Sequence, residues 1–291
     1  MMILAFPDYL SQSQRIATRL NVELAEISVH HFPDGESLVR LPPSLPEHVI
    51  LCRSLTQPND KLIELLLCAT TARELGAKRL TLVAPYLCYM RQDIANQPGE
   101  AVSQRIIGKL LAGLFDDIIT VDPHLHRISS LDQAIPTKHV ISLTAAGEIG
   151  RFLKQKLNHA LLLGPDSESE QWVAKIASQI GFDYGIAHKE RLGDKQVEIT
   201  LPERNYRNHA VVIIDDMAST GRTLGNAAKL LQAAGCEEIY AVVTHALFCG
   251  DAETHILQAG VKAIWTSDSI EHSTARIRLD GLLANALAAI M

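Results

Sequence analysis

One segment in the second half of the chain has the residue types to bind a phosphorylated sugar. The apolar run Val211–Ile214 ends in two acids, Asp215 and Asp216. The loop after them consists of small and hydroxyl-bearing residues with one cation: Ser219, Thr220, Gly221, Arg222 and Thr223. A strand, a tight loop and a helix start together direct backbone N–H groups at an anion. The two carboxylates would accept the hydroxyls of a sugar whose phosphate lies in the loop.

A simpler interpretation of the same segment is a helix cap. Ser219 or Thr220 would then cap the helix, and Asp215 and Asp216 would be solvated turn residues. Helix capping does not require two acids at the carboxyl end of a buried strand, however. Ligands of α/β sheets bind at such strand ends, so we favour the sugar-phosphate site.

The elements that must position this loop alternate along the whole chain. Short apolar runs predict strands buried on both faces: Met2–Phe6, Val49–Cys52, Leu80–Ala84, Asp117–Val121, Ala160–Leu163, Ala210–Ile214, Tyr240–His245 and Ala263–Thr266. Between them, helical patterns occur at, for example, 60–75, 103–114, 169–180 and 220–234. This alternation predicts an α/β fold with mainly parallel sheets flanked by helices.

Two stretches interrupt the alternation. Residues 22–41 alternate apolar and polar positions around Pro33-Asp34-Gly35, which predicts antiparallel strands. Residues 183–205 are polar and charged, and predict a flap or hairpin. A domain boundary is expected near 143/144. The halves share one faint echo, an apolar strand that runs into Asp122 in the first and into Asp215 in the second.

Composition excludes several classes of protein. The chain of 291 residues has 47% hydrophobic and 21% charged residues and a formal net charge of -6, and no basic stripe suits a nucleic-acid partner. No run reaches the roughly 20 apolar residues of a membrane helix, and no secretory signal is visible. The 5 cysteines are scattered without metal-ligand spacing. They indicate reduced thiols in a cytoplasmic protein.

Several other segments form a combination with the loop. These are Phe32-Pro33-Asp34-Gly35-Glu36, Tyr89-Met90-Arg91-Gln92-Asp93 followed by Pro98-Gly99-Glu100, and Val121-Asp122-Pro123-His124. In type and spacing they resemble the ribose-phosphate diphosphokinase family, also called phosphoribosyl pyrophosphate synthetases. The resemblance covers nearly the whole chain. It implies two tandem phosphoribosyltransferase-like domains, residues 1–143 with the nucleotide-binding segments and 144–291 with the ribose-5-phosphate loop and a catalytic flap.

The resemblance also implies a reaction and its residues. Diphosphate would pass from ATP to the 1-hydroxyl of ribose 5-phosphate, giving 5-phosphoribosyl 1-diphosphate and AMP, with Mg²⁺ as cofactor. The catalytic residues would be Lys189, Arg191 and His124, and the metal-facing residues His124 and Asp166. ATP would contact Phe32, Asp34, Glu36, Arg91, Gln92 and Asp93. Ribose 5-phosphate would contact Asp215, Asp216, Ser219, Thr220, Gly221, Arg222 and Thr223.

The resemblance further implies a homodimer or higher homo-oligomer with shared active sites. The Phe32–Glu36 turn of one copy would complete the nucleotide site of a neighbour.

Alternatives remain for individual segments and for the function. Arg91-Gln92-Asp93 could be a solvated loop, Lys189 and Arg191 an ordinary charged hairpin, and His124 a strand-end histidine. Two stretches depart from the family pattern: residues 94–97 are uncharged, and residues 167–170 add two carboxylates. They leave room for a non-catalytic regulatory paralogue that binds nucleotide or sugar phosphate. A base-specific phosphoribosyltransferase is the third possibility, because it would share the 215–223 loop.

Overall fold

The chain folds into two compact units. The computed structural model describes residues 1–125, 127–191 and 197–291, without the side chains of 189–191 and 197–199. The first unit comprises Met1–Thr144 together with Leu279–Met291, and the second comprises Ala145–Arg278. The expected division at 143/144 placed everything after it in the second domain, whereas the last helix packs with the first unit.

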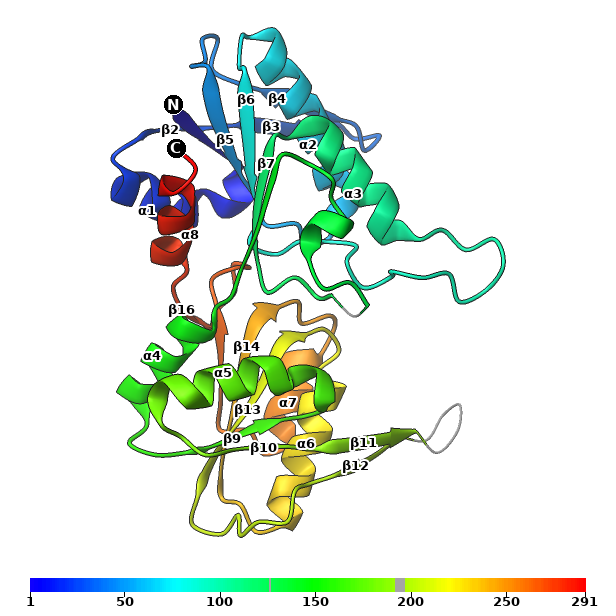
Figure 1. The fold of residues 1–291 in the computed structure, drawn as a ribbon, viewed down its shortest axis with the longest axis vertical. Helices are drawn as coiled ribbons and strands as arrows, with labels where there is room; N and C mark the ends of the chain where they lie inside the picture. The colour runs from blue at the N-terminus through cyan, green and yellow to red at the C-terminus, as the bar shows by residue number, and fades with distance from the viewer. Residues whose placement is uncertain (126, 192–196) are drawn as a thin grey trace. The chain divides into compact units, whose positions relative to one another are not determined.

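A six-stranded sheet forms the centre of the first unit (Figure 1). All of its strands are parallel, in the order β2 (Glu23–Glu26), β1 (Met2–Ala5), β5 (His48–Cys52), β6 (Arg79–Val83), β7 (Asp117–Val121) and β8 (His139–Leu143). One face is covered by α1 (Leu10–Leu20) and α8 (Asp280–Ala288), the other by α2 (Pro58–Glu74) and α3 (Ser103–Leu114). Asp280 fixes α8 to α1 by ion pairs with Arg15 and Arg19.

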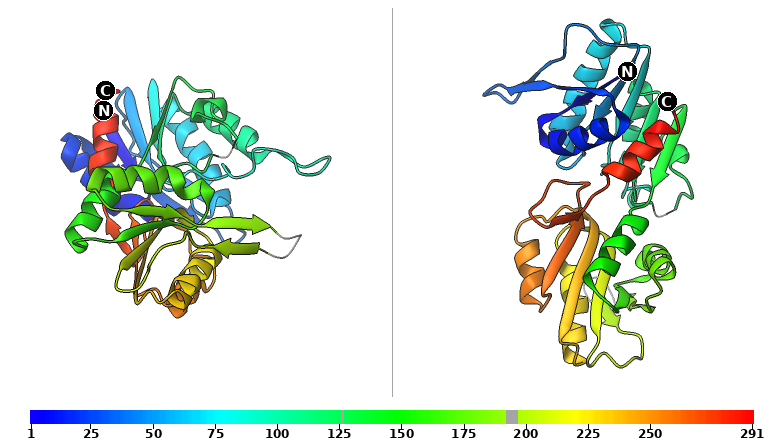
Figure 2. Two further views of the ribbon diagram at one scale, coloured as in Figure 1. Left: turned by 60° about the horizontal axis from the view of Figure 1, so that its bottom comes forward. Right: turned by 90° about the vertical axis from the view of Figure 1, so that its left-hand side faces the viewer.

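The second unit repeats this design. Its parallel strands run in the order β10 (Tyr184–Ile186), β9 (Leu161–Gly164), β13 (Ala210–Ala218), β14 (Glu238–Ala246), β15 (Ala263–Ser267) and β16 (Ala275–Ile277). One face is covered by α4 (Ala146–Lys156) and α5 (Glu170–Ile180), the other by α6 (Arg222–Ala233) and α7 (Ala252–Gln258) (Figure 2).

The two sheets have the same spatial strand order. If the six sheet strands of each unit are numbered as they occur along the sequence, that order is 2-1-3-4-5-6 in both. Each unit also inserts an antiparallel hairpin between its second and third strands, β3 (Ser28–His31) with β4 (Ser37–Arg40) and β11 (His188–Arg191) with β12 (Val197–Thr200). Even the roots of the hairpins correspond: Ile27 N–H donates to Ala5 O at 2.9 Å, and Ala187 N–H donates to Gly164 O at 2.8 Å. The faint echo in the sequence is therefore architectural.

The predicted buried strands are confirmed at their predicted positions. The predictions for residues 22–41 and 183–205 are confirmed only in part. Each does contain an antiparallel hairpin, but each begins with a parallel edge strand, β2 or β10. An edge strand has a neighbour on one side only, and the outer residues of β2, Glu23 and Glu26, are exposed. Such a strand lacks the continuous apolar run that identifies a central strand.

A buried carboxylate holds together the amino ends of three neighbouring strands of the first unit, β6, β7 and β8. Asp117, fully buried at the start of β7, accepts hydrogen bonds from Arg79 at 2.7 Å, Thr81 at 2.8 Å and His139 at 2.7 Å. Burial alone would raise the pKa of Asp117, but these hydrogen bonds outweigh it and lower the pKa to about 2. Arg79 also donates to Ile290 O at 2.8 Å, after α8.

Asp117→Asn should therefore destabilise the protein by about 2 kcal/mol at neutral pH. Because folding lowers the pKa, this stabilisation is complete above the ordinary carboxyl pKa of 3.8 and is lost as the pH falls through about 2. Urea unfolding of parent and variant at several pH values measures it. The difference in unfolding free energy between parent and variant should narrow below pH ~4. The control variant Asp132→Asn, at an exposed position, should unfold with the same free energy as the parent at every pH. A difference that stays constant down to pH ~2 would refute the assignment.

No helix in the described part of the chain has both the length and the apolar character that crossing a membrane requires.

Candidate active site

In the second unit, the strand order reverses between β9 and β13, and the candidate site lies at their carboxyl ends. The chain continues from β9 to Asp166, and Asp215 and Asp216 lie in the last part of β13. Crevices at such reversal points are where open α/β sheets bind ligands. The sequence thus supplies three carboxylates and the predicted phosphate loop at one edge of the sheet.

The phosphate loop connects β13 to α6 and requires glycine at its last position. Gly221 has φ of +71°, a left-handed conformation. A Cβ atom here would lie 2.9 Å from Ala252 O and 2.9 Å from Ile256 Cδ1, so the loop packs directly on α7. Cys249 N–H donates to Ser219 O at 2.8 Å, which holds the loop on its other side. The backbone of the loop is therefore fixed before any ligand arrives.

The start of α6 has no side-chain cap, since its N-cap residue is Gly221 itself. The capping interpretation, with Ser219 or Thr220 as the N-cap, is therefore wrong. Thr220 and Arg222 are exposed, and Ser219 and Thr223 are half-buried. Helix N-termini attract anions through their unpaired N–H groups and the helix dipole. This first turn therefore remains suited to a phosphate group.

The carboxylates beside the loop repel one another. Asp216 is buried, and its N–H donates to Asp215 Oδ1 at 3.0 Å. Burial, together with the negative charges of Asp216 and Asp166, raises the pKa of Asp215 well above its usual range. Sugar hydroxyls or a cation placed here would relieve this concentration of negative charge.

The acidic turn 167–170 has a structural role. Asp166 Oδ1 accepts from the N–H groups of Glu168 and Ser169 at 3.1 and 3.3 Å, forming a capping box at the short helix η3 (Ser167–Ser169), which leads into α5. Carboxylates at a helix start are stabilised by the helix dipole. The two added acids, Glu168 and Glu170, are thus placed where they favour the helix, and this departure from the family pattern does not argue against activity.

Two predicted nucleotide segments of the first unit follow the neighbouring strands β6 and β7. In the first, Gln92 is held against the start of α3, because its Oε1 accepts from Ser103 Oγ at 3.1 Å and its carbonyl accepts from Gln104 N–H at 3.2 Å. Arg91, next to this anchor, is exposed. The segment is thus a fixed platform rather than a solvated loop.

Asp93 connects the two segments. Its carboxylate is buried and accepts from Arg127 Nη1 at 2.6 Å and from Arg127 N–H at 3.2 Å. We therefore expect Asp93 to position the half-buried His124, three residues before Arg127, and not to contact nucleotide itself. Arg127 was not predicted from the sequence. The only feature that could have indicated it is its position, as a cation three residues after His124. His126 lies outside the described residues.

The Phe32–Glu36 turn closes the β3–β4 hairpin. Phe32 N–H donates to Glu36 O at 2.8 Å, Glu36 N–H donates to Asp34 Oδ1 at 3.2 Å, and Gly35 takes the left-handed φ of +93°. Phe32 is 40% exposed and stacks edge-on against His30 alone of the described aromatic rings. An exposed aromatic ring on a rigid turn suits stacking on a nucleotide base.

Lys189 and Arg191 lie on β11, paired with Ile199 and Val197 of β12. Residues two apart on a strand point to the same face, but the two side chains lie outside the described residues. The hairpin is rooted beside Gly164, two residues before Asp166. The predicted flap therefore arises next to the carboxylates.

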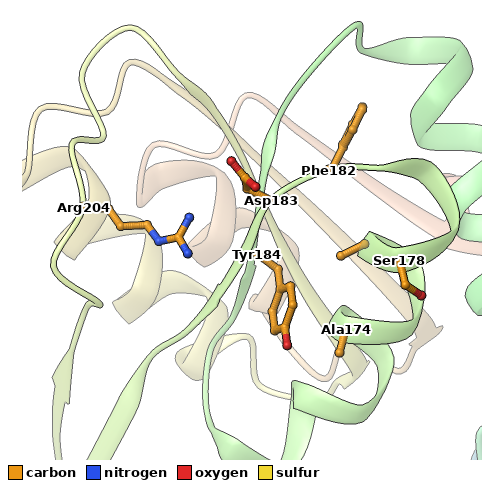
Figure 3. A pocket seen from close by; sticks show the side chains of 7 residues that line it. Ala174, Ser178, Phe182, Asp183, Tyr184 and Arg204 are labelled. Atoms are coloured by element: carbon orange, nitrogen blue, oxygen red, sulfur yellow. The ribbon is translucent and has the colours of Figure 1, made fainter.

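A separate hollow of about 530 Å³ lies at the opposite edge of the second sheet, where β10 begins (Figure 3). It is lined by Ala174, Ala177, Ser178, Phe182, Asp183, Tyr184 and Arg204. Its one cation, Arg204, is accompanied by Asp183, and the hollow contains none of the predicted site residues.

Metal-binding residues do not cluster within the described residues: no three His, Cys, Asp or Glu side chains there are arranged to hold an ion. The two predicted metal-facing residues belong to different units, His124 to the first and Asp166 to the second.

Fold and loop together define the phosphoribosyltransferase class. Residues 142–260 match the family described as "Phosphoribosyl transferase domain", and residues 1–114 match the "N-terminal domain of ribose phosphate pyrophosphokinase". A ribose-phosphate pyrophosphokinase of Methanopyrus kandleri is 33% identical over 99% of this chain and 98% of its own. Another, from Saccharolobus solfataricus, is 34% identical over 86% and 87%. The chain belongs to the ribose-phosphate pyrophosphokinase family, whose members are also called diphosphokinases.

A solved structure agrees with this fold. The phosphoribosylpyrophosphate synthetase of Mycobacterium smegmatis matches 99% of this chain and 98% of its own with a TM-score of 0.84 at 21% identity. The predicted fold class, two phosphoribosyltransferase-like domains with parallel sheets, is thereby confirmed.

Proposed function

We propose that this protein is an active ribose-phosphate diphosphokinase: it transfers diphosphate from ATP to the 1-hydroxyl of ribose 5-phosphate and releases AMP. The observation that carries the proposal is the uncapped start of α6 behind Gly221, with Asp215 and Asp216 beside it. The 5-phosphate binds the N–H groups of this turn and the hydroxyls of Ser219, Thr220 and Thr223. The carboxylates accept the ribose hydroxyls, which orients the 1-hydroxyl.

In the transfer, the 1-oxygen of the sugar bonds to the β-phosphorus of ATP as the bond from that phosphorus to the α-phosphate oxygen breaks. The proton of the 1-hydroxyl is lost, and AMP carries away the bridging oxygen. Arg91 offers a planar fork for the nucleotide phosphates, and Phe32 offers its exposed ring to the base. Lys189 and Arg191 neutralise the charge that develops on the transferring phosphates.

Mg²⁺ fits the residues present. Mg²⁺ keeps several waters and binds through one or two carboxylates plus substrate phosphates, not through a closed protein cage. The carboxylates of Asp215, Asp216 and Asp166 provide such oxygens, and burial together with the charges of its two neighbours raises the pKa of Asp215. When bound, the ion would neutralise phosphate charge, and Asp166 would face it or its water. His124 of the first unit remains a predicted metal-facing residue.

The direct test is product formation by the purified protein with ATP, ribose 5-phosphate and Mg²⁺. AMP and 5-phosphoribosyl 1-diphosphate should appear in equal amounts, followed by ³¹P NMR. If ATP is never consumed although ribose 5-phosphate binds, the protein is the regulatory paralogue. Diphosphate release with a purine or pyrimidine base would favour the base-specific transferase, although that enzyme would not need the first unit.

A second copy of the chain completes this site in the proposal. The middle of α2 carries apolar residues on several sides: Leu62 and Leu65 pack on the sheet, while Ile63, Leu66 and Leu67 are exposed. A helix that is apolar on all sides is normally covered on all sides. α2 packs against β4, and so lies beside the hairpin that carries Phe32. The expected cytoplasmic location is part of the same proposal.

The double change Ile63→Glu/Leu67→Glu should therefore convert an oligomer to a monomer with little activity. The two residues lie one helical turn apart and share a face, and burying carboxylates there opposes association. Light scattering gives the size. Leu257→Glu on α7 of the second unit is the matched control, because the exposure of Leu257 lies between those of Ile63 and Leu67. An oligomer that survives the double change would place the interface elsewhere.

A further inference from the structure

The first unit has its own reversal point, between β1 and β5, and the chain itself fills it. In the second unit the corresponding strands lead to Asp166 and to the phosphate loop. In the first unit they lead to Asp8 and Arg53. Arg53 is buried, lies over the Phe6 ring at 4.0 Å and donates to Asp8 Oδ1 at 3.1 Å. A crevice that could have held a ligand therefore holds an ion pair.

The loop between β5 and α2 corresponds to the phosphate loop. The residue before α2, Gln57, is left-handed with φ of +47° and gives no side-chain cap, like Gly221 before α6. Here Lys61 occupies the loop: its Nζ donates to Ser54 O at 2.9 Å and Thr56 Oγ1 at 3.1 Å, and lies 2.6 Å from Asp8 Oδ2. An ammonium group already bound to the loop's oxygens and to Asp8 leaves no cradle for phosphate.

At the inner end of this network lies Glu64 of α2, with its side chain fully buried. Its Oε2 lies 2.5 Å from Arg53 Nη1, while its Oε1 lies 2.7 Å from His31 Nε2 and accepts from Ser37 Oγ at 2.9 Å. Burial would raise the pKa of Glu64, but the adjacent guanidinium of Arg53 and the hydrogen bonds from His31 and Ser37 outweigh it and lower the pKa. The carboxylate is thus held ionised.

Both hairpin partners of Glu64 flank the Phe32–Glu36 turn. His31 ends β3, Ser37 begins β4, and the two residues face each other across the hairpin. Their shared bond to one oxygen fixes the turn to α2 and, through Arg53, to the end of β5. Apart from its root at Ile27, this is where the hairpin is anchored to the body of the unit by buried charge.

We propose that Glu64 is a positioning residue for nucleotide binding: the reversal point of the first unit has become an ion-pair network that aims the Phe32–Glu36 turn. The inference rests on the proposed function, in which that turn takes the nucleotide. A pre-positioned turn loses less conformational freedom when it binds, so loosening it weakens ATP binding without touching the reacting atoms.

The test removes the two hairpin groups that bond to Glu64, the ring of His31 and the hydroxyl of Ser37. It leaves the Glu64–Arg53 pair intact, since breaking a buried ion pair risks unfolding. The double variant His31→Ala/Ser37→Ala should raise the KM for ATP about tenfold, with kcat and the KM for ribose 5-phosphate within about twofold of the parent. Amide hydrogen exchange across 28–37 should also quicken in the protein without substrates. The variant His31→Gln/Ser37→Thr, which keeps both donors, should restore the KM and the exchange rate.

Two further variants separate the possible outcomes. Ser28→Ala, at an exposed position on β3, should leave every parameter unchanged. Phe32→Ala removes the ring that the turn presents and should raise the KM for ATP directly. If Phe32→Ala acts and the double variant leaves the KM for ATP and the exchange unchanged, the inference fails while the proposed function stands.

A merely structural role for the bonds would appear as a lower kcat or lower stability without a selective change in the KM for ATP, and this also overturns the inference. If Phe32→Ala has no effect either, the turn does not bind nucleotide, and the inference falls with that assignment. Product formation by the parent protein tests the diphosphokinase activity independently of both.

Discussion

Gly221→Ala should raise the KM for ribose 5-phosphate about a hundredfold while the KM for ATP changes little. The φ of +71° opposes any side chain, and a Cβ would lie 2.9 Å from the Ala252 carbonyl, which cannot move as a flexible side chain could. The loop must therefore shift, and its N–H groups no longer converge on one phosphate. Steady-state kinetics with each substrate varied in turn measures the effect.

The control is Gly235→Ala at the other end of α6. Gly235 has a similar φ of +85°, but its Cβ would meet only the flexible side chain of Arg207, at 3.0 Å. It should cost stability without affecting either KM. Cys249 gives a reading independent of turnover: alone of the 5 cysteines it is exposed, and its Sγ lies 3.6 Å from Ser219 Oγ. Ribose 5-phosphate should protect it from alkylation in the parent but not in Gly221→Ala. Equal protection in both would contradict the placement of the phosphate.

Lys189→Ala should lower kcat about a thousandfold and leave both KM values within about threefold. A cation that meets charge developing only in the transition state contributes to turnover and not to ground-state binding. Rapid-quench measurement of AMP formation separates the chemical step from product release. The exposed neighbour His188, on the same strand, provides the control His188→Ala. A Lys189→Ala protein with more than a tenth of the parent's turnover would exclude Lys189 from the transfer.

The central strands and the phosphate loop could be predicted because each has a local cause. Buried parallel strands need continuous apolar runs, and β7 was predicted at Asp117–Val121, the bounds it has. The edge strands β2 and β10 were missed, since one open side permits polar residues. In each unit, the strand and the hairpin after it appeared in the sequence as one irregular stretch.

The site was harder to predict wherever its contacts join distant segments. The pairing of Arg127 with Asp93, and of Glu64 with His31 and Ser37, depends on strand order, which local patterns do not contain. Capping of α6 by a hydroxyl was an alternative that the sequence allowed. Only the left-handed Gly221 at the N-cap decided against it. The sequence likewise offered no sign that α8 completes the first unit rather than the second.

The packing of α8 with the first unit affects how the protein folds during synthesis. The second unit, Ala145–Arg278, is inserted in the first, whose core includes the fully buried Leu279, Leu283 and Leu287 of the returning segment. Domains usually fold in the order in which the ribosome releases them. Here the later unit can finish first, because its whole sheet emerges before the segment that the earlier unit needs. Until α8 has been synthesised, one face of the sheet of the first unit therefore remains partly uncovered.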